Sequence, residues 1–332
     1  MAVILVTGGA GYVGAHCCRA LAGAGHDVVV YDNLSNGHAA FVKWGPLIEG
    51  DIRDRARLDE AFAAHRPDAV LHCAALIEVG ESVRDPARFY DNNVAGTLTL
   101  LNSMRAAGVA RFVFSSTCAT YGAPRTTPMD ETHAQAPVSP YGWTKLMIEQ
   151  AARDHAAAYG LRFALLRYFN AAGADAEAGI GERHEPESHA IPLALFTLLA
   201  RRQSFNLFGD DYDTPDGSCV RDYVHVRDLA DAHVRAINDL IAGGTSFAAN
   251  LGAGVGVSVL DLLATIERVT GRRVAFERAP RRAGDPPILV ADNRFAKARL
   301  GWAPTQDLDE IIASAWRWHS EVEPGVFGAP AG

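Results

Sequence analysis

The chain has 332 residues, of which 48% are hydrophobic and 21% charged, with a formal net charge of −8. This length can bury a large core and form two lobes. The acidic balance argues against nucleic acid or an anionic membrane as the main partner. No apolar run reaches the roughly 20 residues of a membrane span, so we expect no transmembrane helix.

The cysteines indicate a reducing compartment. Five are present, scattered along the chain and without Cys-x-x-Cys spacing, which is typical of reduced thiols. The N-terminus enters an apolar segment without a basic leader or cleavage region, so we expect no signal peptide and a cytoplasmic protein. Histidines and acidic residues do not follow metal-site spacing, so we expect no metal.

The first motif is a glycine-rich turn, TGGAGYVG at residues 7–14, directly after an apolar run at 3–6. Such a run is typical of a parallel strand buried on both faces. Gly8 permits the tight turn, Gly11 lets backbone approach a pyrophosphate, and Gly14 lets the next helix pack closely. The start of that helix offers N–H groups and the positive end of its dipole to phosphates.

An acid completes this pattern. A second predicted strand over 27–32 ends on Asp32, eighteen residues after Gly14. A carboxylate there hydrogen-bonds the adenosine ribose and repels a 2′-phosphate, which predicts NAD rather than NADP. The alternative is a glycine loop that only turns the chain. Strand, helix and acid in register argue against it.

Strands and helices alternate in the first half. Apolar runs predict strands at 2–7, 27–32, 46–50, 69–73, 111–115 and 162–168. Amphipathic patterns predict helices near 12–24, 54–65, 86–107 and 140–159. We therefore expect an α/β fold with a doubly wound parallel sheet of Rossmann type and a smaller mixed α/β capping domain.

The regular alternation of predicted strands and helices ends after residue 172. Residues 173–189 lack periodicity and suggest a surface excursion, and 209–218 suggests an acidic loop. Further helices are predicted near 190–202, 226–242, 258–270 and 307–320, with Ser258 as an N-cap. We expect a dinucleotide domain over 1–172 and a second domain over 173–332, with part of 223–252 returning to the first.

The second motif is Tyr141-x-x-x-Lys145 at the start of a predicted helix. Residues four apart share a helix face, so both side chains can enter one cleft. A tyrosine titrates near pH ~10, and as a base it needs a cation to favour the phenolate. Lys145 and a positive nicotinamide ring would supply it. The fifth strand delivers Ser115 and Thr117 to the same edge, although strand-end hydroxyls often only satisfy backbone.

Several stretches of this sequence, including both motifs above, resemble the extended short-chain dehydrogenase/reductases, and among them the UDP-glucose 4-epimerases. The similar segments lie in collinear order over nearly the whole chain. They include TGGAGYVG (7–14), YDNL (31–34), GDIRD (50–54), VGESVRDPARFYDNNVAGT (79–97), FSSTCATYG (114–122), SPYGWTK (139–145), LLRYFNAAGA (165–174), VRDYVHVRDLADAH (220–233), NLGAGVGVSVLD (250–261) and APRRAGDPP (279–287).

The resemblance implies site residues position by position. Thr117, Tyr141 and Lys145 form the implied catalytic set. The NAD-binding candidates, with the turn glycines and Ser115 included, are Gly8, Gly11, Tyr12, Val13, Gly14, Asp32, Asn33, Asn36, Asp51, Ile52, Cys73, Ala74, Ala75, Leu76, Asn93, Ser115, Lys145 and Phe169. The substrate-binding candidates are Thr117, Tyr141, Asn170, His189, Asn206, Leu207, Phe208, Arg221, Arg282, Asp285 and Leu289.

The implied reaction is epimerisation at C4 of a UDP-hexose, through a 4-keto intermediate and tightly bound NAD. Residues 173–332 then mainly bind the UDP-sugar. Arg221 and Arg282 suit a diphosphate, because a guanidinium can grip phosphate oxygens at two points. The resemblance also implies a homodimer joined through the helices near 86–107 and 140–159.

Three positions depart from the family pattern. Ile77 stands where a lysine contacts the nicotinamide ribose, which predicts weaker NAD retention. His189 stands at a uracil-side asparagine, and Leu289 replaces a bulky tyrosine that closes the sugar pocket. A smaller Leu289 side chain would admit an N-acetyl group.

The sequence argues against some alternative activities and leaves others open. Sugar-nucleotide 4,6-dehydratases need an Asp-Glu pair after the active-site threonine, and decarboxylating relatives need an acid, whereas this chain has Cys118 and Ala119. A 4-epimerase of a UDP-N-acetylhexosamine, UDP-pentose or UDP-uronate shares the mechanism and stays open. A non-catalytic NAD-sensing regulator is disfavoured because the Tyr141–Lys145 pair is intact.

Overall fold

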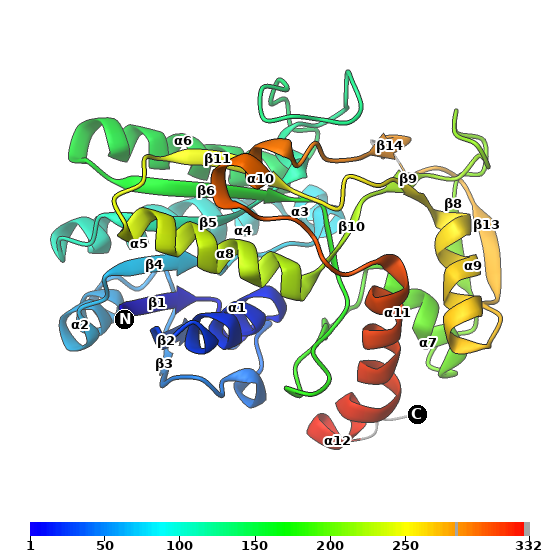
Figure 1. The fold of residues 1–332 in the computed structure, drawn as a ribbon, viewed down its shortest axis with the longest axis horizontal. Helices are drawn as coiled ribbons and strands as arrows, with labels where there is room; N and C mark the ends of the chain where they lie inside the picture. The colour runs from blue at the N-terminus through cyan, green and yellow to red at the C-terminus, as the bar shows by residue number, and fades with distance from the viewer. Residues whose placement is uncertain (283–284, 329–332) are drawn as a thin grey trace.

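A parallel sheet forms the centre of the protein, which we describe from a computed structural model (Figure 1). The structure describes residues 1–282 and 285–328. The sheet has seven strands in the order β11-β6-β5-β4-β1-β2-β3, and every pairing is parallel. The strands are β1 (Val3–Thr7), β2 (Asp27–Asp32), β3 (Leu47–Glu49), β4 (Ala69–His72), β5 (Arg111–Thr117), β6 (Arg162–Tyr168) and β11 (Phe247–Leu251). The strand order reverses between β1 and β4, where such sheets open a crevice for ligands.

Helices cover both faces of this sheet. They are α1 (Tyr12–Gly23), α2 (Arg55–His65), α3 (Val79–Arg84), α4 (Pro86–Phe89), α5 (Gly96–Ala106), α6 (Pro140–Tyr159), α8 (Val226–Ile241) and α10 (Arg294–Leu300). A π-helical turn, Tyr90–Ala95, joins α4 to α5. On one face α1 packs against α8, and on the other α5 packs against α2 and α6.

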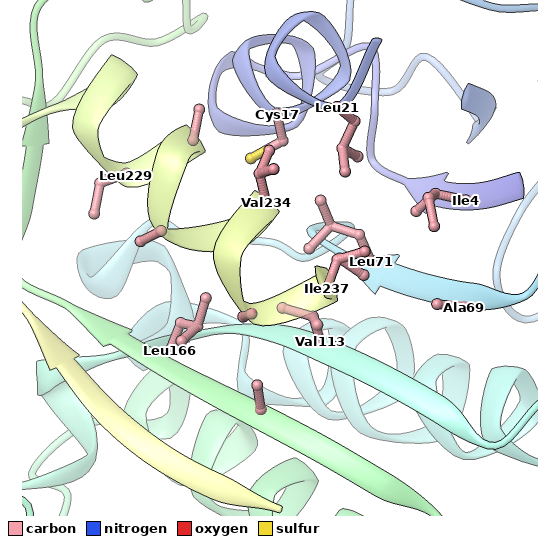
Figure 2. Close-up of a cluster of buried hydrophobic side chains, with 14 of the residues drawn as sticks. Ile4, Cys17, Leu21, Ala69, Leu71, Val113, Leu166, Leu229, Val234 and Ile237 are labelled. Carbon is pink, nitrogen blue, oxygen red and sulfur yellow. The ribbon is translucent and has the colours of Figure 1, made fainter. Parts of the chain in front are cut away.

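Alternation along β1 explains why its first four residues are all apolar. Ile4 points to the face covered by α1 and α8, where Figure 2 shows it near Leu21 and Leu71. Leu5 points to the opposite face and joins the cluster that contains Leu101 from α5. Both faces exclude water, so the strand is apolar from Val3 to Val6. Thr7 at its end is buried as well, and its hydroxyl is hydrogen-bonded to His72.

The remaining elements form small sheets and helices beyond the carboxyl ends of the main strands (Figure 1). They are β7 (Asn170–Ala172), α7 (Ala190–Leu198), β8 (Phe205–Phe208), β9 (Val220–Arg221), β10 (Tyr223–His225), β12 (Val257–Ser258), α9 (Val259–Thr270), β13 (Phe276–Ala279), β14 (Ile288–Leu289), α11 (Leu308–Arg317) and α12 (Glu323–Phe327), with a π-helical turn at Trp318–Val322. Short 3₁₀ turns lie at Ala39–Phe41 and Cys118–Thr120. Leu195, Leu262 and Ile312 share their apolar core.

The predicted fold class is confirmed, and six of the sheet strands lie within or beside their predicted ranges. The predicted N-cap is also confirmed, since the Ser258 hydroxyl accepts from the Asp261 amide at 3.0 Å. The seventh strand, β11, and the helix α10 were not predicted. The helix expected over 190–202 ends at Leu198, and that expected over 86–107 is interrupted by the π-helical turn.

One segment of the second half returns to the main sheet. Helix α8 packs on α1, β5 and β6, and β11 pairs with β6 as an edge strand. The division into domains at residue 172 stays a prediction. Within residues 1–282 and 285–328, no helix combines the length and apolarity needed to cross a membrane.

Candidate active site

A cavity of about 810 Å³ lies between the carboxyl ends of the main strands and the small sheets. Its walls come from the glycine turn, the ends of β2 and β5, the start of α6, and segments of the second half. This is the crevice expected at the switch point of a doubly wound sheet. The sequence-predicted residues that line it are Gly8, Gly11, Tyr12, Val13, Gly14, Asp32, Asn33, Asn36, Ile52, Cys73, Ala74, Ala75, Leu76, Thr117, Tyr141, Lys145, Phe169, Asn170, His189, Asn206, Phe208, Arg221, Arg282, Asp285 and Leu289.

The glycine turn has no room for side chains. Gly8 has φ +74°, and a Cβ there would lie 2.5 Å from the Ala74 nitrogen. A Cβ on Gly14 would lie 2.0 Å from the Gly8 carbonyl oxygen. The Gly11 amide donates to that same oxygen at 3.1 Å, which closes the turn. Only glycine therefore lets β1 and α1 approach this closely.

The first turn of α1 leaves its amides open to the cavity. Gly11 occupies the N-cap, no described side chain caps the helix, and no acidic residue lies in its first turn. Free N–H groups and the positive helix dipole favour an anion here. Asp32 lines the same cavity, and its carboxylate is fixed by the amides of Ala10 and Leu34 at 3.0 and 2.8 Å. The turn therefore fits a pyrophosphate, with an acid placed for a ribose.

Tyr141 and Lys145 lie in the first two turns of α6, a helix capped by the Ser139 hydroxyl, which accepts from the Gly142 amide at 3.2 Å. Both side chains are buried. The Lys145 ammonium donates to the Ser115 carbonyl oxygen at 3.0 Å and lies 5.9 Å from the centre of the Tyr141 ring. The spacing of the two residues places them at one wall of the cavity.

Burial dominates the titration of this pair. It lowers the pKa of Lys145 to about 8, because the ammonium loses hydration. It also raises the pKa of Tyr141, while a hydrogen bond with the Thr117 hydroxyl acts in the opposite direction. The sequence predicts a phenol made acidic by Lys145 and a nicotinamide ring together, whereas burial is the largest influence on the pKa of Tyr141 in this structure.

A buried ion pair fixes α6 to the sheet. Arg167 on β6 donates from Nε to Glu149 Oε1 at 2.8 Å and from Nη2 to Oε2 at 2.5 Å. The Ser116 hydroxyl donates to Glu149 Oε1 at 2.7 Å. Glu149 lies one helical turn beyond Lys145, and Ser116 precedes Thr117. The pair therefore sets the position of α6 relative to the end of β5.

Two arginines face the cavity from the second half. Arg221 donates to a carboxylate oxygen of Asp285 and to the Val220 carbonyl oxygen. The Arg282 guanidinium lies 3.9 Å from the centre of the Phe208 ring. Both arginines line the cavity, where a guanidinium can contact an anionic ligand, and Arg221 does so while paired with Asp285.

Four predicted contact residues do not line the cavity. Asp51 binds Asn33 through its carboxylate at 3.0 Å, so it positions that neighbour. Asn93 accepts from the Leu76 amide at 2.8 Å and donates to the Leu76 carbonyl at 3.0 Å, which holds the 73–77 segment. The Ser115 carbonyl oxygen accepts a hydrogen bond from Lys145. Leu207 points to the buried face of β8, away from the cavity.

Comparison with known proteins identifies the family. A model described as the NAD dependent epimerase/dehydratase family matches residues 4–252, which is most of the chain. This chain belongs to that family.

Similar proteins of known name align with nearly the whole of this chain. It is 62% identical to a UDP-glucose 4-epimerase of Rhizobium meliloti, over 97% of this chain and 98% of the relative. A crystal structure of a UDP-glucose 4-epimerase from Brucella ovis in complex with NAD has a TM-score of 0.93 and 50% identity, and covers 95% of this chain and 98% of that chain. One from Stenotrophomonas maltophila, with bound NAD and formylated UDP-arabinopyranose, has a TM-score of 0.95 and 41% identity, and covers 98% and 100%.

Sequence reasoning missed several residues of this epimerase/dehydratase family member. Arg202, at the end of the expected 190–202 helix, adds a third arginine to the cavity wall. Asn92 lines the cavity where Asn93 was expected. The Glu149–Arg167 pair was also missed. An arginine inside the apolar strand at 162–168 was the signal, since a buried charge needs a partner.

Proposed function

We propose that the protein is a UDP-glucose 4-epimerase, which interconverts UDP-glucose and UDP-galactose with retained NAD. One observation carries the proposal. The hydroxyls of Thr117 and Tyr141 and the ammonium of Lys145 share one cavity with an uncapped helix start built for a pyrophosphate. The close relatives named as UDP-glucose 4-epimerases support the same activity.

The glycine turn would hold the NAD pyrophosphate, Asp32 the adenosine ribose, and the 73–77 segment with Phe169 the nicotinamide half. When bound, NAD supplies a hydride acceptor that can return the hydride and a positive charge beside the phenol. That added charge offsets the burial that raises the pKa of Tyr141. Ile77 offers no polar group to the ribose, so NAD retention rests on the remaining contacts.

The chain's own residues would move and hold the proton. The Tyr141 oxygen would remove the proton from the sugar O4 and return it after the 4-keto sugar turns over. The Thr117 hydroxyl would orient O4, and Lys145 would stabilise the phenolate. Cys118 and Ala119 follow Thr117, so no acid stands there to eliminate water or assist decarboxylation.

The substrate's diphosphate would be gripped by Arg221 and Arg282, with Asp285 holding Arg221 in place. Firm contacts to the diphosphate and few to the hexose would let the sugar turn between hydride transfers. A second substrate class follows from Leu289, which lines the cavity beside Phe169 and Tyr121. The leucine side chain is smaller than the tyrosine of the family pattern and leaves room for an N-acetylhexosamine.

Incubation with UDP-galactose and no external redox cofactor tests the activity. The expected result is one equilibrium mixture of UDP-glucose and UDP-galactose reached from either side, with no net reduction of NAD. Unchanged substrate, with UDP and NAD still bound, would favour an NAD-sensing regulator instead.

The protein is also proposed to be a homodimer. Large apolar side chains remain exposed on neighbouring helices, with Leu98 on α5 and Trp143 and Met147 on α6. Burying them against a second copy would stabilise the pair. Sedimentation velocity checks this, since Met147→Asp should shift a dimer to a monomer.

A further inference from the structure

Four side chains of the segment before α7 converge on one point in the cavity wall. They belong to Glu182, His184, Glu187 and His189, and one ligand atom of each lies within 4.8 Å of the other three. The sequence predicts no metal site, and this arrangement differs from that expectation. The segment is neither helix nor strand, so its spacing matched no regular ligand pattern.

The separations between these atoms are close to those around a tetrahedral ion. His184 Nδ1 lies 3.6 Å from Glu182 Oε1 and 3.5 Å from Glu187 Oε2. His189 Nδ1 lies 2.9 Å from Glu182 Oε1, and it is hydrogen-bonded at 2.9 Å to Glu187 Oε1, the oxygen that faces away from the ion. Metal–donor bonds of about 2.0–2.2 Å place tetrahedral neighbours roughly 3.3–3.6 Å apart. The two His184 separations fall in that range, and the His189–Glu182 separation is shorter, at hydrogen-bond length.

Two of the donor atoms have no other use. Glu187 Oε2 and His184 Nδ1 are buried without a hydrogen-bond partner among the described residues. The Glu187 side chain is only 5% exposed, and its other oxygen accepts from the Ser188 and His189 amides at 2.7 and 2.9 Å. The carboxylate is therefore fixed with one oxygen aimed at the centre of the cluster. A buried polar atom without a partner is costly, and a bound ion would remove that cost.

The charges also require a cation. Glu182 and the side chain of Glu187 are buried close together, and such carboxylates repel each other. Arg183 is engaged elsewhere, with Glu323 and Glu185. A divalent ion would balance both carboxylates.

We propose that Glu182, His184, Glu187 and His189 bind one divalent transition-metal ion, with Zn²⁺ the matching ion. Two imidazole nitrogens and two carboxylate oxygens favour zinc over calcium or magnesium, which prefer oxygen ligands alone. Four protein donors fill a tetrahedral shell, so the ion has a structural role. The Nε2 atom of His189 stays free for the uracil-side role that the family resemblance implies.

The site would brace the wall of the NAD cavity. The His184 ring lies edge-on to Tyr12, 6.3 Å between centres, and Tyr12 opens α1. An ion that fixes His184 would therefore also fix the start of the dinucleotide-binding helix. Loss of the ion is expected to loosen NAD binding while leaving the catalytic side chains intact.

Metal binding is tested on the untagged full-length protein, without any sugar nucleotide. Equilibrium dialysis against zinc, followed by elemental analysis, should give one bound equivalent. Replacement by Co²⁺ should give the intense visible absorption of a tetrahedral cobalt site. Because neither readout involves turnover, failure of this proposal is distinct from failure of the proposed activity.

Variants locate the site. Glu187→Gln and His184→Gln should each lower zinc affinity by at least about tenfold and abolish the tetrahedral cobalt spectrum. Glu185→Gln is the matched control, because this acid lies in the same segment but is exposed and outside the cluster. Less than one-tenth equivalent of zinc in the wild type, or unchanged affinity in a folded Glu187→Gln protein, would overturn the proposal.

Discussion

Arg167 and Glu149 form a two-point ion pair in the interior, with Nε–Oε1 and Nη2–Oε2 distances of 2.8 and 2.5 Å. The pair joins β6 to α6, the helix that carries Tyr141 and Lys145. Burial acts to raise the pKa of Glu149, but Arg167 outweighs it and holds that pKa below its usual range. The geometry of the candidate active site thus depends on a contact outside the cavity.

Removing one partner of this pair should destabilise the protein. Glu149→Gln leaves the Arg167 charge buried without a counter-charge, and we expect a loss of about 3–5 kcal/mol in unfolding free energy. Urea unfolding measures it. Asp59→Asn is the control, since Asp59 pairs with Arg55 on the exposed surface of α2 and such pairs contribute about 0–1 kcal/mol. Equal costs for the two variants would refute the assigned role.

Lys145 should give the nucleotide-free protein a distinctive pH dependence. Its pKa falls from 10.5 to about 8 on folding, so between these values the unfolded chain binds more protons. Stability then rises with pH across that window, and the penalty of burying the charge is fully present below about pH 8. The full difference corresponds to about 3 kcal/mol.

Comparison with Lys145→Met isolates this effect. The stability of the wild type relative to the variant should increase from pH 8 towards 10, as measured by urea unfolding at each pH. Lys297→Met, which removes an exposed lysine on α10, serves as the control. A pH-independent difference for Lys145→Met would show that the lysine is not buried as an ammonium.

The glycine turn should tolerate no side chain at Gly14. A Cβ there would meet the Gly8 carbonyl oxygen at 2.0 Å, so Gly14→Ala should push α1 from β1, lower NAD content at least tenfold and cost about 1–3 kcal/mol. Gly23→Ala, at the other end of α1, is the control because its Cβ meets nothing within 4 Å. Full NAD retention by Gly14→Ala would contradict the proposed cofactor cradle.

Leu289 should set tolerance of an N-acetyl group. We expect the wild type to convert UDP-galactose and UDP-N-acetylgalactosamine with kcat/KM values within about tenfold of each other. Leu289→Tyr should favour the smaller substrate by roughly 10–200-fold, the range a tight pocket achieves by steric exclusion. A wild-type preference above about a thousandfold for UDP-galactose would end this interpretation.

The sequence predicts the fold well because its signals are local. Continuous apolar runs and helical periodicity identify β1 to β6 of the main sheet and its larger helices. Strand β11 was not predicted, because its Phe247–Leu251 sequence contains two alanines and an asparagine and leads into a glycine-rich turn. Its place in the sheet is set by pairing with β6, which no local pattern reveals.

The candidate site was likewise predicted where its signals are local and missed where they depend on tertiary packing. Tyr141 and Lys145 are found from spacing on one helix, and Gly8 and Gly14 from a turn motif. Arg202 lines the cavity through tertiary packing, which spacing does not encode. The burial that raises the pKa of Tyr141 is likewise a property of the folded structure alone.

The central claim is that the Tyr141 hydroxyl transfers the proton at the sugar O4. The most direct test is the turnover number of Tyr141→Phe on UDP-galactose, measured with NAD and UDP binding on the same protein. Tyr159→Phe is the control, since Tyr159 is exposed at the far end of α6. We predict a loss of about 10²–10⁴ in kcat with both ligands still bound. Turnover equal to the wild type would contradict the account.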